Sequence, residues 1–100
     1  MTADRSEGNP CALCARSLPL TFHHLIPRKN HRRSSFRRRF DITDMRSRGT
    51  WLCHDCHRAI HRLHDERTLG LRLNTLEALQ ADPAVQRHVS WAARQRRRPS

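Results

Sequence analysis

Apolar residues along this chain occur in short stretches, and their spacing predicts two strands followed by a helix. Residues 18–26 alternate apolar and polar side chains near Pro19 and Pro27, as a short bounded strand would. A second short strand is predicted at residues 50–52. Residues 55–65 show helical spacing without glycine or proline, which predicts a helix.

The C-terminal part of the chain carries two further helix signals. Gly70 interrupts the stretch that follows the predicted helix of residues 55–65. Asn74 can cap a short helix that extends to residue 79. Asp82 followed by Pro83 is a cap with a first-turn proline, so we expect a last helix that runs from there toward residue 94.

The remaining segments are polar or basic. Residues 1–10 predict a disordered lead-in, and residues 96–100 predict a frayed basic tail. Residues 28–48 contain nine Lys or Arg with little periodicity, so we expect a long basic loop that becomes ordered only on a partner. The chain is then one domain, residues 11–95, with this basic loop inside it.

The composition requires a covalent or metal cross-link. A chain of 100 residues with 36% hydrophobic content buries too little apolar surface to be stable without one. The four cysteines form two Cys-x-x-Cys pairs, and no apolar run at the N-terminus indicates export or a membrane span. We therefore expect a cytoplasmic, reduced protein whose cysteines bind zinc rather than form disulfides.

The charge indicates the kind of partner. Twenty Lys and Arg against nine Asp and Glu give a formal charge of +11, which points to a polyanion, and nucleic acid is the leading candidate. Binding to a membrane surface would need a broad apolar helix face, and the most basic segment offers only Phe36 and Phe40. We expect DNA, and alternatively RNA, as the partner of a monomer or homodimer.

The cysteines have the two-plus-two arrangement that gives zinc a tetrahedral thiolate site. Four thiolates leave the ion no open position, so this site is expected to be structural. A redox dithiol is disfavoured because neither pair lies between a strand and a helix of a thioredoxin-like pattern. A mixed site that uses His54 or His57 in place of a cysteine stays open. The predicted ligands are Cys11, Cys14, Cys53 and Cys56.

Five of the eight histidines have informative positions: His23, His24, His57, His61 and His64. Adjacent strand residues point to opposite faces, so one of His23 and His24 can reach a metal ion while the other stays free for a proton. His57 and His61 are four residues apart and share a helix face. His23, His57 and His61 would leave positions open on a catalytic ion. His24, with an ordinary pKa of about 6.5, suits a general base.

Each histidine alone has a plainer interpretation, as a phosphate contact or part of a solvated helix face. Their combination is more informative, because binding of the two cysteine pairs to one ion would bring the histidines together. His64 is at most an additional ligand or a phosphate contact.

The segments Phe22-His-His-Leu-Ile-Pro27 and Leu52-Cys-His-Asp-Cys-His-Arg-Ala-Ile-His61 resemble the two halves of an HNH endonuclease motif. The resemblance covers roughly residues 11–65, and residues 73–79 are similar to a segment of small bacterial HNH proteins. It implies a small α+β fold: a ββα-metal core, with a hairpin whose long loop is the basic segment, a structural zinc site and extra C-terminal helices. It also implies metal-dependent DNA cleavage that leaves a 5′-phosphate, with Mg²⁺, Mn²⁺, Ni²⁺ or Zn²⁺ as the catalytic ion.

The sequence departs from the family pattern at one position. The middle asparagine of the motif lies nine residues before the first helix histidine, and that position here is Arg48. An arginine there could instead contact the scissile phosphate or stabilise its developing charge. Arg48 is therefore the second candidate catalytic residue beside His24.

The basic segment supplies the candidate grip on the substrate, because arginine can hold phosphates with paired donors. Trp51 and Trp91 could stack on bases, although core packing is the favoured prediction for both. Two other function classes stay open: a noncatalytic zinc-containing nucleic-acid-binding module, and a metal-sensing or redox regulator. The predicted phosphate contacts are Arg28, Lys29, Arg32, Arg33, Arg37, Arg38 and Arg39.

Overall fold

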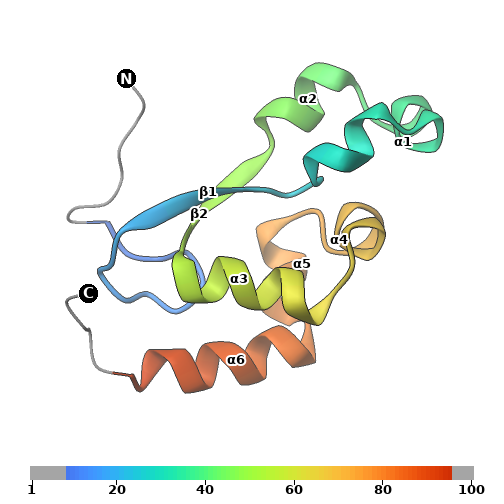
Figure 1. Ribbon diagram of the computed structural model, residues 1–100. Helices are drawn as coiled ribbons and strands as arrows, with labels where there is room; N and C mark the ends of the chain where they lie inside the picture. The colour runs from blue at the N-terminus through green and yellow to red at the C-terminus, as the bar shows by residue number, and fades with distance from the viewer. Residues whose placement is uncertain (1–8, 96–100) are drawn as a thin grey trace.

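The computed structural model describes residues 9–95, in which a two-stranded antiparallel sheet lies beside six short α-helices (Figure 1). The predicted C-terminal tail and all but two residues of the predicted lead-in fall outside these residues. In chain order the elements are β1 (Leu20–His24), the 3₁₀ helix η1 (Arg28–Arg32), α1 (Ser34–Arg39), α2 (Ile42–Ser47), β2 (Gly49–Cys53), α3 (His54–Leu63), α4 (Glu66–Arg72), α5 (Leu76–Ala81) and α6 (Pro83–Ala93).

The two predicted strands form one hairpin. β1 pairs with β2 in a register that sets Leu20 opposite Cys53 and His24 opposite Gly49. Gly49 leaves room for the ring of Phe22, which a Cβ atom at this position would overlap. The alternation along β1 turns His23 toward α3 and leaves it buried, while Phe22 points to the other face. The hairpin therefore delivers a histidine to the helix beside it.

Two helices begin within one residue of where the sequence predicts. α3 starts directly after Cys53, whose sulfur accepts a hydrogen bond from the backbone N–H of Cys56. α6 starts at Pro83, and the Asp82 carboxylate accepts from the N–H of Val85. In Figure 1, α6 runs alongside α3 and covers the side of it that faces away from α1 and α2.

The predicted cap of the short helix α5 is one residue off. Thr75, not Asn74, is the cap, because its hydroxyl accepts from the N–H of Ala78. The Asn74 amide instead donates to the carbonyl of Gly70 at 2.9 Å and so closes the end of α4.

Gly70 does not interrupt a helix as predicted, because it lies inside α4. A Cβ atom at this position would lie 2.6 Å from Cε2 of Phe36 and 2.7 Å from Nδ2 of Asn30. The glycine therefore serves a close contact between α4 and the preceding basic segment rather than a turn. Contacts between residues so far apart in sequence leave no local pattern, which is why the residue spacing does not predict α4.

The prediction of a long basic loop at residues 28–48 is wrong, since η1, α1 and α2 occupy most of it. A separate apolar cluster of Ile26, Phe36 and Met45 holds these helices together. The Asp41 side chain caps α2 by accepting from the N–H of Thr43 at 3.0 Å. Because the segment is so highly charged, these few apolar residues do not stand out in its sequence. They are nevertheless enough to order three short helices.

The main core lies between the hairpin, α3 and the C-terminal helices. All four cysteines belong to it, together with Leu25, Leu52, Ile60, Leu69, Leu73, Leu79, Val85 and Ala92. The prediction that Trp91 packs in the core is wrong, because 48% of its surface is exposed. Every helix of residues 9–95 is too short or too polar to cross a lipid bilayer.

Candidate functional site

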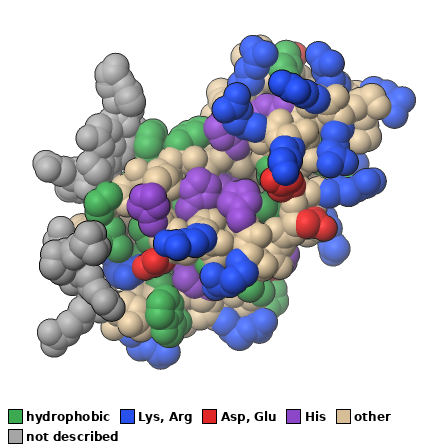
Figure 2. Space-filling model, in the orientation of Figure 1, with side chains coloured by type: hydrophobic (Ala, Val, Ile, Leu, Met, Phe, Trp, Pro, Cys, Tyr) green, Lys and Arg blue, Asp and Glu red, His purple; other side chains and the backbone are tan. Residues whose placement is uncertain are grey.

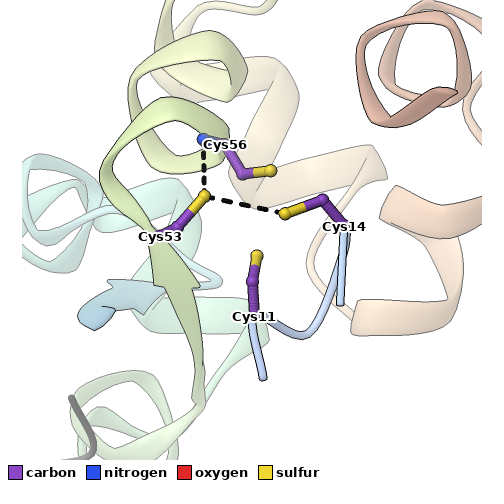
Figure 3. Close-up of side chains that lie close together, drawn as sticks. All are labelled: Cys11, Cys14, Cys53 and Cys56. Carbon is purple, nitrogen blue, oxygen red and sulfur yellow. Dashed lines mark hydrogen bonds between the residues drawn. The ribbon is translucent and has the colours of Figure 1, made fainter. Parts of the chain in front are cut away.

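The four cysteines meet at one point, with two coming from the turn before β1 and two from the junction of β2 and α3 (Figure 3). All four are buried and reduced, and their sulfur atoms lie within 4.8 Å of one another. The first pair sits in a tight turn in which Ala15 has a φ of 67°. The backbone N–H of Ala15 donates to the carbonyl of Cys11, and this bond closes the turn.

The spacing of the sulfur atoms fits zinc. A tetrahedral zinc ion with Zn–S bonds of about 2.3 Å places its sulfur ligands about 3.8 Å apart. The Sγ atoms of Cys14 and Cys53 are 3.8 Å apart. Hydrogen bonds with Cys53 and Cys56 lower the pKa of Cys11, while the bond with Cys11 raises the pKa of Cys53 to about 11. The cysteines could therefore hold a structural zinc ion, which would displace the protons they share.

Arg16 contacts this cysteine site directly, which the sequence did not indicate. Its Nε donates to the sulfur of Cys14 at 3.2 Å, and its Nη2 lies 3.7 Å from the sulfur of Cys53. The same Nη2 forms an ion pair with Asp55 at 3.3 Å. The guanidinium offsets part of the negative charge that four thiolates would gather in the core.

The predicted histidine ligands also converge. The candidate ligand atoms of His23, His57 and His61 lie within 4.8 Å of one another. His57 and His61 come from one face of α3, and His23 comes from β1 opposite them. His23 is buried, His57 is half-buried and His61 is exposed, so this histidine site is closed on one side and open to solvent on the other. Figure 2 shows histidine side chains gathered over α3 at the surface.

His23 is the residue whose environment most clearly suits a metal. Both of its ring nitrogens are buried and have no hydrogen-bond partner among the described residues. A buried polar group without a partner costs about 1–3 kcal/mol, so this arrangement calls for a ligand. Burial, with added repulsion from His57, His61 and His24, lowers the pKa of His23 to about 3. The ring is therefore neutral, which is the form that binds metal ions.

Thr21 fixes the orientation of His57. The Thr21 hydroxyl donates to the carbonyl of Leu52 at 3.1 Å and lies 2.7 Å from Nδ1 of His57. With the single hydroxyl hydrogen directed at the carbonyl of Leu52, Nδ1 of His57 is the donor in the second bond. The lone pair of His57 is then on Nε2, which leaves that nitrogen for the ion. The sequence does not single out Thr21, because nothing local marks a threonine as the partner of a histidine 36 positions away.

His24 lies outside this group of three nitrogens. It follows His23 on β1 and points to the opposite face, where its ring centroid is 5.0 Å from that of Phe22 and 6.0 Å from that of His31. Burial, followed by electrostatic repulsion from His31 and Arg28, lowers the pKa of His24. The two adjacent histidines therefore divide between two faces, as their positions on a strand predict.

Arg48 is held by other partners. Its Nη2 forms an ion pair with Asp44 at 2.7 Å, and its Nη1 donates to the carbonyl of Asn74 at 3.3 Å. The guanidinium also lies 5.8 Å from the centre of the Phe40 ring. The structure thus uses Arg48 to join α2 to the segment before α5 and does not bring it into the histidine site.

The basic residues gather on the helices that connect the two strands (Figure 2). Arg28, Arg32 and Arg37 line one cavity, together with Arg46, which the prediction did not include. Lys29 instead pairs with Glu66 at 3.7 Å. The other three predicted phosphate contacts, Arg33, Arg38 and Arg39, are exposed and do not line that cavity.

His64 is not part of the histidine site. Its Nε2 lies 2.9 Å from the Asp82 carboxylate, and this bond joins the end of α3 to the start of α6. Its position at helical spacing from His61 suggested an additional ligand, but the last turn of α3 directs it toward α6.

The fold and these two sites define a small α+β protein. One site consists of four cysteines that could hold zinc, and the other of three histidines on α3 and the adjoining strand β1. The chain belongs to the same family as the uncharacterized protein YisB of Bacillus subtilis (strain 168). The two are 37% identical over 86 residues, which cover 85% of this chain and 74% of YisB. No model of a known protein family matches the chain, and no solved structure matches it.

Proposed function

We propose that this protein is a metal-dependent endonuclease of the HNH type, which hydrolyses phosphodiester bonds in DNA. The observation that carries the proposal is the convergence of His23, His57 and His61, whose candidate ligand atoms lie within 4.8 Å of one another, together with the lack of a partner among residues 9–95 for the buried ring nitrogens of His23. The hairpin of β1 and β2 beside α3 supplies the two strands and one helix that a ββα-metal core requires. The cysteine site, where the turn before β1 meets the junction of β2 and α3, would hold these elements in place.

The three histidines would hold a divalent ion through neutral ring nitrogens. Such an ion, when bound, supplies positive charge that stabilises the phosphate and the leaving oxygen. His61 is exposed, so a phosphate group can approach the site from solvent. Thr21 keeps the His57 ring in the required tautomer and orientation.

His24 is the proposed general base. An in-line displacement needs the attacking water and the leaving oxygen on opposite sides of the phosphorus, so the base should lie apart from the metal ligands. His24 meets this condition, because it follows His23 directly but points to the other face of the strand. It would take one proton from water while the water oxygen bonds to phosphorus and the bond to the 3′ oxygen breaks. The products are a 5′-phosphate and a 3′-hydroxyl that takes a proton from solvent.

The test is a plasmid-cleavage assay at low salt with added Mg²⁺, Mn²⁺ or Ni²⁺. His24→Ala and His57→Ala should abolish cutting, whereas His54→Ala should retain it. His54 is the matched control, because it is an exposed histidine on α3 outside the group of three. Circular dichroism and zinc content of each variant establish that the fold is intact. Normal cleavage by His24→Ala would refute the assigned base, and no cleavage with any ion would refute the nuclease.

A second candidate function is a noncatalytic zinc-containing module that binds nucleic acid. The partners of Arg48 favour it, since a guanidinium held by Asp44 and the carbonyl of Asn74 is not directed at a scissile phosphate. This alternative predicts DNA binding without cutting under every ion.

A further inference from the structure

The helices between the two strands line an open cavity of about 420 Å³ on the face of β1 opposite the histidine site. Its walls come from the end of β1 and from η1, α1 and α2, the segments for which the sequence predicts an unstructured loop. The apolar cluster of Ile26, Phe36 and Met45 holds these walls together from behind. The polar residues that line the cavity are His24, His31, Arg28, Arg32, Arg37 and Arg46.

Within residues 9–95, no carboxylate neutralises the charge of this cavity. None of these residues brings a carboxylate into its lining, and none of its four arginines has an ion pair with them. The two acids of the same segment are engaged elsewhere, because Asp41 caps α2 and Asp44 binds Arg48. Four guanidinium groups around one hollow repel one another, and an anion that enters the hollow offsets this repulsion.

His31 makes the cavity a shaped site rather than a loose cluster of charges. It is buried, and its Nε2 donates to the backbone carbonyl of Ile26 at 2.7 Å. That bond holds the ring against the end of β1 and fixes which nitrogen carries the proton. One wall of the cavity is therefore rigid, while the four arginines supply paired donors that match phosphate oxygens.

We propose that this cavity, the arginine pocket, is a phosphate-binding site that seats one backbone phosphate of a nucleic acid. The pocket volume lies within the range of about 300–1,000 Å³ that is usual for small-molecule sites. It is larger than one phosphate group, so an attached sugar fits as well. His24, the proposed general base, lines the pocket, so a phosphate seated there lies beside one of the proposed catalytic residues. The assignment of the anion to a nucleic-acid backbone rests on the proposed function, whereas binding of phosphate itself does not.

Matched double variants separate this pocket from general charge. Arg37→Gln with Arg46→Gln removes two charges from the pocket, and Arg38→Gln with Arg39→Gln removes two charges from exposed positions outside it. All four residues are exposed, so both proteins should fold. Affinity for a short DNA duplex is measured by fluorescence anisotropy over a range of salt, without added divalent ions, so that no cutting is involved.

The pocket variant should bind the duplex at least about 10-fold more weakly than the control variant. The slope of log affinity against log salt should fall by about 0.9 for each backbone phosphate that the variant no longer neutralises. Equal reductions of affinity in the two double variants would overturn the proposal, because charge alone would then explain binding.

A second arm uses inorganic phosphate. NMR signals of the His24 and His31 rings should shift on phosphate titration of the wild type and stay unchanged in the pocket variant. Phosphate binding with equal DNA affinity in both variants would overturn the nucleic-acid assignment, since the pocket would then take a free phosphate. If the protein does not cut DNA but the two double variants differ in DNA affinity as expected, the proposed function is refuted and the assignment of the arginine pocket stands.

Discussion

Replacing Thr21 by valine removes the hydroxyl group beside His57 and keeps the branched shape of the side chain. In the structure this hydroxyl lies 2.7 Å from Nδ1 of His57 and donates to the carbonyl of Leu52. Without it, the His57 ring loses the acceptor that holds its proton on Nδ1. Valine also favours strands at least as well as threonine, so we expect β1 to persist.

The expected effect follows from the role of such partners in metal sites. Removing a group that orients a ligand lowers metal affinity by roughly 10- to 100-fold. This corresponds to about 1.4–2.8 kcal/mol of binding free energy at the histidine site. The Thr21 hydroxyl bonds to His57 and Leu52 rather than to a cysteine, so the zinc of the cysteine site should be retained in full.

The assay is a calorimetric titration of Ni²⁺ into protein whose cysteine site already contains zinc. Thr43→Val is the control, because it makes the same exchange at an exposed position on α2. Nitrogen NMR of His57 provides a second measurement, since the variant should move protons from Nδ1 toward Nε2. Equal Ni²⁺ affinity in Thr21→Val and wild type, with the His57 tautomer unchanged, would refute the argument.

Three further predictions concern stability. Removing zinc with a strong chelator, or replacing Cys53 by serine, should unfold the domain, as measured by circular dichroism. The reason is that zinc binding contributes about 10–16 kcal/mol, whereas the whole stability of a domain is about 5–15 kcal/mol. A folded apoprotein would contradict this. Gly70→Ala should lower the Tm. The added methyl group would contact the Phe36 ring at a cost of about 1–3 kcal/mol, which exceeds the gain in helix propensity of about 1 kcal/mol. A higher Tm would show that the ring moves aside. Asp82→Ala should lower the free energy of unfolding, measured with urea, by about 2 kcal/mol, and His64→Ala by only about 1 kcal/mol. Asp82→Ala removes both the cap of α6 and the bond to His64, whereas His64→Ala removes only that bond. Equal losses would argue against the cap.

The features that the sequence alone predicted depend on neighbours a few residues apart. The pairs Cys11–Cys14 and Cys53–Cys56 are each set by one turn, and His57 and His61 share a face of any α-helix. The start of α6 follows from Asp82 and Pro83 in the same way. Local backbone geometry fixes such arrangements wherever the rest of the chain lies.

The features that only the tertiary structure decided depend on contacts between distant segments. The Thr21 hydroxyl meets His57 across 36 positions, and Gly70 meets Phe36 across 34. Arg46 and His31 line one cavity because the cluster around Met45 folds η1 and α2 together. In a segment this basic, charge dominates the pattern and conceals the few buried side chains that order it. Residue spacing therefore predicted which side chains could bind a metal, and long-range packing determined which groups orient them and where the arginines form a pocket.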